Sequence, residues 1–435
     1  GIAKRLVQTN KEYVNPNHVC IAVAGGGGHA IATLAATPGA SSLFLEGTVA
    51  YDRNSFQSYV GELVDDSSFK FSSLEAAEML SRAAVRRALQ YRANLDEYPR
   101  CIGIGVASAL VSTRKHSKKS SFGYIVATRA DGSQWTCNIT LAPESRTRLE
   151  EDQFMGELAL RAVEQLQTRG TQKLVLEDEE DQIEESFHQV DSEDPIAEGA
   201  KRILRGDVEA ILFLPLQDKF VAMTDPVLPL ESLVFPGSFN PPHQGHTTLA
   251  QVASSAWDGA SSAVFLELSL SNPDKPSMSP ESVSERAHAF FGLQDHLPKE
   301  WGILLTRAPL FARKVEVLKP FMAPVQRGGR PQMGFVIGTD TMVRILNPMY
   351  YGDSEEDMFE AVRAMGHSGV HFVVGGRLEQ RGGDEDGRFV TGEDEVRALP
   401  KDVQSLFTLV KEDDFRVDIS STEIRKRKEE QKKEL

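Results

Sequence analysis

Short apolar runs alternate along this chain with longer segments in which apolar positions recur at helical spacing. The runs at 18–23, 101–107 and 123–128 have the length and composition of buried strands. Residues 74–93 and 150–169 carry alanine and leucine at helical spacing and predict amphipathic helices. Strands and helices that alternate in this way are typical of an α/β layered fold.

The alternation starts again in the second half of the chain. Apolar runs at 233–235, 263–270, 334–337 and 370–374 predict strands, and helical segments separate several of them. This order predicts a Rossmann-like domain with a parallel sheet. Ligands bind at the carboxyl ends of the strands in such sheets, so the turns after these runs are candidates for a site.

Two segments lie between these halves. Residues 176–195 are acidic with few apolar side chains, so they cannot bury enough surface to fold alone and predict a flexible linker. Residues 196–230 contain one helical and two strand-like segments, which we expect to form a bridging element packed against the second domain. At 435 residues the chain is too long for one typical core. We therefore expect a first domain at 1–175 and a second at 231–435.

Composition and charge narrow the class of protein. Hydrophobic residues make up 40% of the sequence and charged residues 26%, as in ordinary soluble proteins, and no apolar run approaches a membrane span. The net charge of −15 argues against general nucleic-acid binding. Cys20, Cys101 and Cys137 lack the spacing of metal ligands and predict buried thiols in a reducing intracellular compartment. Because the first residue is Gly1, we expect a trimmed start, and the choice between cytoplasm and organelle stays open.

Residues 233–250, LVFPGSFNPPHQGHTTLA, contain the clearest chemical motif. A strand runs through a loop of glycine and proline into a helix that begins near Thr247. Free backbone N–H groups and the positive end of a helix dipole face an anion at such a junction. His243 and His246 can converge on that anion and donate hydrogen bonds to it. The competing interpretation is a proline–glycine turn that happens to carry two histidines.

A second motif lies near the C-terminus, where residues 417–425 read VDISSTEIR. Ser420 or Ser421 can cap a helix at this point. Thr422 and the free amides would face phosphates, with Arg425 one turn further on. A capped helix with a solvated basic face is the simpler alternative, because basic residues follow directly.

Together these motifs resemble the nucleotidylyltransferase superfamily, whose pattern includes His-x-Gly-His and an I-S-S-T-x-x-R box. The nearest resemblance is to the nicotinamide mononucleotide adenylyltransferases, which begin G-[ST]-F-[ND]-P. It implies that a mononucleotide phosphate attacks the α-phosphorus of ATP and that pyrophosphate leaves. Catalysis would then consist mostly of positioning and charge neutralisation, with Mg²⁺ on the triphosphate. The implied partners are ATP and a phosphorylated small-molecule acceptor.

The resemblance also implies a role for each matching residue. His243 and His246 would contact the α- and β-phosphates, and they would be joined in catalysis by Lys275 and Arg425, which steady the pyrophosphate. The implied nucleotide-binding residues are Gly237, Ser238, Phe239, Gly338, Asp340, Ser420, Ser421 and Thr422. No all-protein metal cage is expected, since phosphate oxygens and water would hold the Mg²⁺.

Simpler interpretations of some residues stay open. Lys275, in N-P-D-K-P, could be an exposed turn lysine, and Asp340, in G-T-D-T, could be a helix cap. Arg286 resembles the arginine of the family's E-R pair. Arg377 could reach a substrate phosphate or be an ordinary surface arginine.

The acceptor is the least defined part of this hypothesis. The resemblance points to nicotinamide or nicotinate mononucleotide and thus to NAD biosynthesis. However, Trp301 does not match the family's tryptophan that stacks on the nicotinamide ring. Adenylyl or cytidylyl transfer to another phosphorylated acceptor is one alternative. A non-catalytic nucleotide-binding scaffold or regulatory subunit is the other.

The first domain resembles a different family in residues 35–51, AATPGASSLFLEGTVAY, and 103–109, GIGVASA. Both are similar to the C-terminal domain of competence-damage-inducible (CinA) proteins, a nicotinamide mononucleotide deamidase domain. The family's A-E-S-C-T-G-G loop corresponds to residues 22–28, AVAGGGG, without the serine nucleophile, and its lysine corresponds to Phe56, although Tyr51 is retained. The glycine run could still cradle a phosphate, but a tight turn explains it equally well. We expect a domain without deamidase chemistry that serves folding, regulation or homodimerisation.

Overall fold

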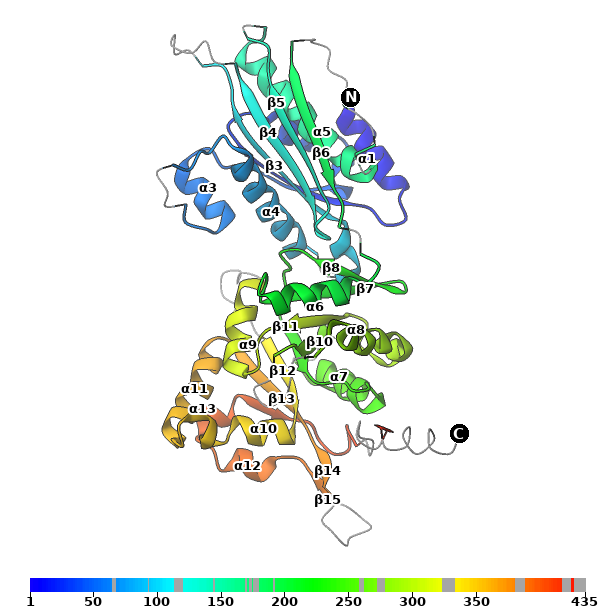
Figure 1. Cartoon of the computed structure of the whole chain (residues 1–435), viewed down its shortest axis with the longest axis vertical. Coiled ribbons are helices and arrows are strands. Elements are labelled where there is room, and N and C mark those ends of the chain that lie inside the picture. The colour runs from blue at the N-terminus through cyan, green and yellow to red at the C-terminus, as the bar shows by residue number, and fades with distance from the viewer. Residues whose placement is uncertain are drawn as a thin grey trace. The chain divides into compact units, whose positions relative to one another are not determined.

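The computed structural model describes most of the chain and divides it into two compact units. The first unit comprises Gly1–Asp191 with Met223–Val227, and the second comprises Ser192–Ala222 with Leu228–Leu435. Figure 1 shows the elements of both. The described residues are 1–64, 68–92, 94–112, 120–143, 145–168, 170–171, 174, 180–190, 192–257, 262–271, 278–322, 333–379, 388–416 and 424–425.

The first unit is built on a mixed sheet with six strands in the described residues, in the order β2-β1-β3-β4-β5-β6. Strands β2 and β3 pair parallel with β1, and the remaining neighbours pair antiparallel. The strands are β1 (His18–Ala24), β2 (Phe44–Val49), β3 (Cys101–Ala109), β4 (Phe122–Arg129), β5 (Gln134–Thr140) and β6 (Gln182–His188). The helices are α1 (Ile2–Glu12), α2 (His29–Ala35), α3 (Arg53–Val60), α4 (Leu74–Gln90) and α5 (Arg148–Thr168), with short 3-10 turns at Ala40–Ser42 and Leu95–Arg100.

Helix α4 lies directly on β3 because two glycines in that strand place no side chain between them. A Cβ atom added to Gly103 would lie 2.1 Å from the carbonyl oxygen of Ser81, and one added to Gly105 would lie 2.0 Å from that of Ala77. Side chains alternate along a strand, so the one residue between these glycines, Ile104, faces the other side of the sheet. There it belongs to a buried cluster that includes Met155 and Leu158 of α5.

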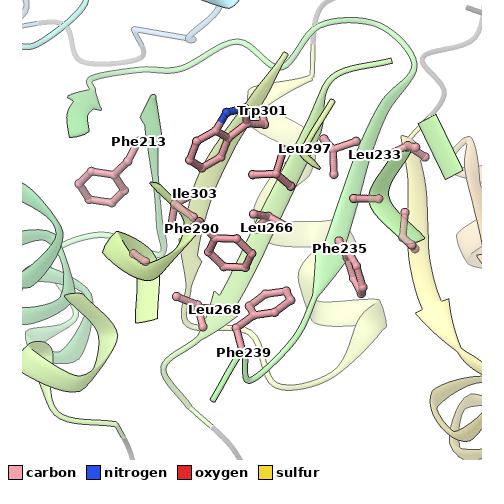
Figure 2. Packing of buried hydrophobic residues seen from close by; sticks show 14 of the residues in the cluster. Phe213, Leu233, Phe235, Phe239, Leu266, Leu268, Phe290, Leu297, Trp301 and Ile303 are labelled. Atoms are coloured by element: carbon pink, nitrogen blue, oxygen red, sulfur yellow. The ribbon is translucent and has the colours of Figure 1, made fainter. Parts of the chain in front are cut away.

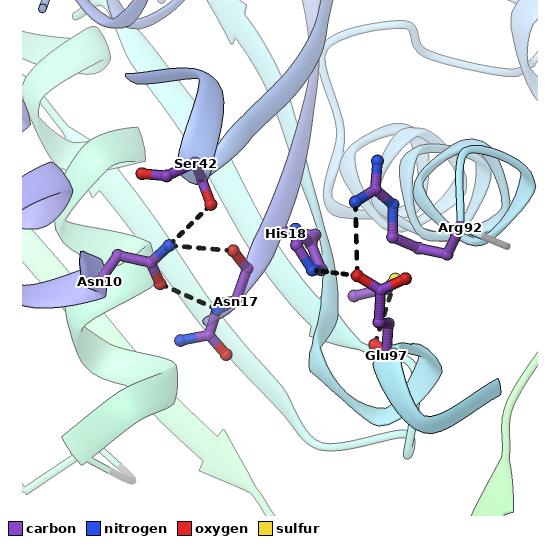
Figure 3. A network of polar contacts seen from close by, with 7 residues as sticks. Asn10, Asn17, His18, Ser42, Arg92 and Glu97 are labelled. Carbon is purple, nitrogen blue, oxygen red and sulfur yellow. Dashed lines mark hydrogen bonds and ion pairs between the residues drawn. The ribbon is translucent and has the colours of Figure 1, made fainter. Parts of the chain in front are cut away.

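Polar contacts hold the chain where it enters β1 (Figure 3). The Asn10 side chain accepts the N–H of Asn17 at 2.8 Å and donates to the carbonyl oxygens of Asn17 at 3.2 Å and Ser42 at 3.0 Å. Nearby, Nε2 of His18 lies 3.3 Å from the Glu97 carboxylate, and burial holds the pKa of His18 below its ordinary value. The Asn10 contacts thus join α1 to the residue before β1 and to the turn at Ala40–Ser42, and the His18 contact joins β1 to the turn at Leu95–Arg100.

Strand β6 corrects one expectation from the sequence. It lies within the acidic segment 176–195, which we expected to be a flexible linker, and it pairs antiparallel with β5 along its whole length. Ile183 and Phe187 pack against the core, whereas the acidic side chain of Glu184 is exposed. The high acidic content of the segment hid the alternation of side chains that is typical of a strand. The partner strand β5 supplies the backbone hydrogen bonds that the segment cannot form alone.

The second unit contains an eight-stranded sheet, counted over the described residues, in the order β16-β13-β12-β9-β10-β11-β7-β8. Neighbours from β16 to β11 are parallel, and β7 joins β11 antiparallel. The segment that we expected to bridge the domains supplies α6 and the strands β7 and β8 at one edge of this sheet. The strands are β7 (Ala210–Leu216), β8 (Lys219–Met223), β9 (Ser232–Pro236), β10 (Val264–Ser269), β11 (Trp301–Thr306), β12 (Met333–Gly338), β13 (Val370–Gly375) and β16 (Phe407–Leu409).

The order of these strands creates a topological switch point at β9. From β9 the chain builds β10 and β11 on one side, then returns to build β12 and β13 on the other. The connections therefore leave the carboxyl ends of β9 and β12 in opposite directions, and the crevice between such ends is where open α/β sheets bind ligands. The prediction of an α/β protein with a mostly parallel second sheet is confirmed.

Helices cover both faces of the second sheet and bury its apolar side chains. Figure 2 shows one such cluster, in which Phe235, Phe239, Phe290 and Trp301 pack around leucines of β10. The helices are α6 (Pro195–Arg205), α7 (Gln244–Ala256), α8 (Pro280–His288), α9 (Phe311–Leu318), α10 (Thr339–Ile345), α11 (Glu355–His367), α12 (Glu393–Arg397) and α13 (Lys401–Gln404). Short 3-10 turns occupy Ala289–His296, Lys319–Phe321 and Pro348–Tyr351, and β14 (Arg377–Glu379) pairs with β15 (Arg388–Val390) as a separate ribbon.

The close contact between α4 and β3 makes a testable prediction. We expect Gly105→Ala to lower the free energy of unfolding of the first unit by about 3 kcal/mol, because the methyl group would meet helix backbone that cannot move aside. Denaturant unfolding followed by circular dichroism measures this. The control is Gly28→Ala, whose added Cβ would meet only a side-chain oxygen of Asp152 at 3.9 Å. Equal stability of the two variants would contradict the packing argument.

Candidate functional site

The loop between β9 and α7 is anchored to the core by an aromatic side chain. Phe239 has a left-handed backbone with φ of 42°, and its ring is 1% exposed. That ring meets Phe235 and Phe290 edge-on, with centroids 5.6 and 5.1 Å apart. A Cβ atom at Gly237 would lie 2.5 Å from the Phe239 ring, so the glycine allows the ring to fold under the loop. Both residues thus shape the loop that carries the histidines.

The two histidines of the motif lie against each other at the start of α7. Their ring centroids are 3.8 Å apart with a tilt of 32°. Nδ1 of His246 accepts a hydrogen bond from the backbone N–H of His243 at 3.1 Å. Burial, reinforced by the neighbouring His243, lowers the pKa of His246 to about 3. His246 is therefore neutral near pH 7, and the proton of its ring resides on Nε2, which is left as a donor.

His243 is the residue that caps α7, so it sits at the positive end of a helix of 13 residues. Burial holds its pKa below the ordinary value. Its Nδ1 is buried and has no hydrogen-bond partner among the described residues.

Two arginines that are far apart in sequence come together along the same loop. Arg286, on α8, donates to the carbonyl oxygen of Ser238 at 2.8 Å, and Arg425 donates to that of Asn240 at 2.6 Å. Burial lowers the pKa of Arg286, and the charge of nearby Arg425 acts in the same direction. Positive groups that are close enough to oppose each other's charge favour a polyanionic ligand. The sequence indicated Arg286 only as part of an E-R pair on a helix, and its place beside Arg425 is a property of the fold.

The second strand of the crevice brings its own predicted residues. Gly338 ends β12 and is the N-cap residue of α10, and Asp340 lies in the first turn of that helix. The Asp340 carboxylate is not the cap: it pairs with Arg377 at 2.6 Å, and both side chains are about half exposed. Arg377 thus contacts the carboxylate of the G-T-D-T turn, and a contact with a substrate phosphate stays a prediction.

Four predicted site residues lie outside the described residues, namely Lys275, Ser420, Ser421 and Thr422. Their roles remain those that the sequence resemblance implies. Within the described part of the chain, no group of three or more His, Cys, Asp and Glu side chains is placed to hold a metal ion. The same part contains no helix that is long and apolar enough to cross a membrane.

None of the three tryptophans of the sequence is available to stack on a substrate ring. Trp135 belongs to the first unit and is 1% exposed. Trp257 and Trp301 are each 6% exposed in the core of the second unit. Neither Trp301, which does not match the family's stacking tryptophan in sequence, nor the other two tryptophans can therefore take the place of that residue.

The glycine run of the first unit is closed by the chain itself. The N–H groups of Gly27 and Gly28 donate to the Asp152 carboxylate on α5 at 2.7 and 3.1 Å, and that of Gly26 donates to the Ser108 hydroxyl at 2.6 Å. A Cβ atom at Gly26 would lie 2.1 Å from the side chain of Leu110. The amides that could cradle a phosphate are thus already bound, and the run is a tight, packed turn.

The two residues matched to the family's tyrosine and lysine lie in different surroundings. Tyr51 is exposed and borders a pocket of about 260 Å³, where the Arg148 guanidinium reaches its hydroxyl at 3.3 Å. Phe56 is fully buried and packs edge-on against Phe71 at 5.2 Å. A buried phenylalanine therefore occupies the position that corresponds to the family's lysine.

Comparison with known proteins finds one matching family and several similar solved structures. Residues 234–427 match the cytidylyltransferase-like family. Comparison with curated proteins finds no match. The competence/damage-inducible protein CihA of Agrobacterium tumefaciens is 17% identical over 39% of this chain and 95% of its own, with a TM-score of 0.31. CinA superfamily proteins of Enterobacter cloacae and Escherichia coli are 12% and 13% identical over 38% of this chain, covering 88% and 87% of theirs, with TM-scores of 0.28 and 0.27.

The motif, the switch point and the family match fall on the same part of the chain. The N-terminal region resembles CinA-family competence/damage-inducible proteins in structure. Residues 234–427 form a cytidylyltransferase-like domain, that is, a nucleotidylyltransferase domain.

Proposed function

We propose that this domain transfers AMP from ATP to a mononucleotide phosphate and releases pyrophosphate. The observation that carries the proposal is the close, tilted pair of histidine rings at the start of α7, beside the switch point of the sheet. Nicotinamide or nicotinate mononucleotide is the acceptor that we propose, and the sequence resemblance of the motif supports it. The protein would then act in NAD biosynthesis.

The chemistry requires positioning and charge neutralisation more than a protein nucleophile. A phosphate oxygen of the acceptor attacks the α-phosphorus of ATP, and the bond to the bridging oxygen of pyrophosphate breaks. Nε2–H of neutral His246 and the ring of His243 would donate to the phosphate oxygens that gain charge. Arg286 and Arg425 would hold the polyphosphate, and we retain Lys275 and residues 420–422 for the leaving pyrophosphate.

A divalent ion fits this arrangement as part of the substrate complex. The described residues offer no cluster of metal ligands, whereas the triphosphate itself provides the oxygen ligands that Mg²⁺ prefers. When bound, the ion would neutralise charge on the triphosphate. The chain's own contribution would be to orient the phosphates through the histidines and arginines of the loop.

A second candidate is transfer of a different nucleotidyl group or transfer to a different phosphorylated acceptor. Two observations favour it: the matching family is cytidylyltransferase-like, and both tryptophans of the second unit are buried. Binding of a nucleotide without turnover would instead indicate a scaffold or regulatory subunit. For the first unit we propose a non-catalytic role, with homodimerisation as its simplest use, because its glycine run is internally bound.

Pyrophosphate release tests the proposed reaction directly. We expect turnover with ATP, Mg²⁺ and nicotinamide or nicotinate mononucleotide, and a loss of roughly 100-fold in His246→Ala, because one preorganised donor is removed. The control is His367→Ala, an exposed histidine on α11. Turnover only with CTP or only with another acceptor would select the second candidate. Nucleotide binding without any turnover would overturn the proposal.

The depressed pKa of His246 predicts an acid-sensitive domain. The pKa is about 3 in the folded protein and 6.5 for an ordinary histidine, so between these values the unfolded chain binds a proton that the folded chain does not. The contribution of neutral His246 to the stability of the domain is therefore fully present above about pH 6.5, and it declines as the pH falls towards 3. His246→Gln should lose less stability on acidification, as measured by urea unfolding at a series of pH values. Identical pH dependence of the variant and the original protein would contradict the assignment.

The internal carboxylate of the first unit gives a separate prediction. Asp152→Ala removes the acceptor of two backbone N–H groups, and a hydrogen bond to a charged group contributes about 1.5–3 kcal/mol. We expect the first unit to unfold at lower denaturant concentration while pyrophosphate release by the second unit is unchanged. Glu157→Ala, at an exposed position of the same helix, is the control and should have little effect. A loss of turnover in Asp152→Ala would show that the first unit takes part in the reaction.

A further inference from the structure

A buried ion pair lies beneath the carboxyl ends of the strands that carry the site. Glu267 of β10 is 1% exposed and Lys314 of α9 is 3% exposed, and the Lys314 ammonium lies 2.7 Å from Oε1 of Glu267. The Thr306 hydroxyl of β11 donates to the same oxygen. This cluster lies on the opposite face of β10 from the leucines of Figure 2, because side chains alternate along the strand.

The ion pair between Glu267 and Lys314 is not well suited to stabilise the fold. Charged groups lose their hydration when they are buried, and their attraction offsets this loss only when the remaining polar atoms are also satisfied. Oε2 of Glu267 is buried and has no hydrogen-bond partner among the described residues. An apolar pair of similar volume would avoid that cost, so the charges indicate a geometric requirement at this place.

The contacts of the cluster show what it holds in position. Lys314 also donates to the carbonyl oxygen of Ala308 at 2.7 Å, and the Ser269 hydroxyl donates to the same oxygen at 3.0 Å. The ends of β10 and β11 are thereby tied together. The backbone carbonyl of Glu267 accepts the N–H of Gly237 at 3.0 Å, and Gly237 is the first residue of the histidine loop after β9. One cluster thus connects α9 to three strand ends.

We propose that Lys314 and Glu267 are positioning residues for nucleotidyl transfer, which fix the end of β10 and through it the start of the loop that carries His243 and His246. This inference rests on the proposed function of the same site. Neither side chain is among the groups that we propose to contact the phosphates. Their effect is on the placement of the loop, and small displacements of catalytic groups lower the rate of the chemical step more than they weaken substrate binding.

The test separates positioning from stability by removing the pair in two ways. Lys314→Met leaves the Glu267 carboxylate buried alone and is expected to lower both stability and kcat. The double variant Glu267→Leu with Lys314→Met replaces the pair by apolar side chains and is expected to regain the melting temperature. We expect kcat of the double variant to stay about 10- to 100-fold below that of the original protein, with the KM for the nucleotide little changed. Arg313→Met is the matched control, one residue earlier on α9, where the ion pairs of the arginine with described residues are the exposed ones with Glu209 and Glu316.

A second readout does not depend on activity. Amide hydrogen exchange of the peptide that contains Gly237 should be faster in both Lys314 variants and unchanged in Arg313→Met. Recovery of kcat together with stability in the double variant, or unchanged exchange at Gly237, would overturn the inference. If the original protein shows no turnover with any acceptor, the proposed function fails, and the exchange experiment still decides whether the pair positions the loop.

Discussion

The hydrogen bond from the backbone N–H of His243 to Nδ1 of His246 is the interaction on which the C-terminal site depends. It occupies an amide at the helix start that would otherwise be free, and it fixes which nitrogen of His246 carries the proton. Because that ring is also buried against Phe239, it stays neutral and in one orientation. This one hydrogen bond therefore fixes the His246 ring at the start of the helix and leaves its Nε2–H as the donor.

The rest of the second unit places this hydrogen bond close to two positively charged side chains. The parallel strands bring the helix start to the switch point, and the arginines of α8 and of the C-terminal motif contact carbonyl oxygens of the same loop. The chain as a whole carries a net charge of −15, so a bound polyanion would depend on local positive groups such as Arg286 and Arg425.

Much of this arrangement could be predicted from the sequence, because it depends on local patterns. Apolar runs gave the central strands of both units, and the spacing of glycine, proline and histidine gave the position of the loop. Strand β6 was missed because Glu185 lies between its two apolar residues, Ile183 and Phe187, on the half-buried face, so the strand shows no continuous apolar alternation. The pairs Arg286–Arg425 and Glu267–Lys314 could not be predicted, since each joins residues that only the tertiary fold brings together. A lone lysine in an amphipathic helix is read as solvated, and only the fold shows that Lys314 points inward.

The packed glycine run of the first unit also has a consequence for how this domain can change. A side chain at Gly26 would collide with Leu110, and a ligand at the amides of Gly27 and Gly28 would have to displace the carboxylate of Asp152. No single substitution can relieve both obstacles, and each change made alone would remove packing or hydrogen bonds before it gave access to anything. Variants on the way to a loop with accessible amides would thus be less stable than the present protein. Stepwise mutation would therefore rarely reopen the loop, and the loop is a poor starting point for redesigning a catalyst in this unit.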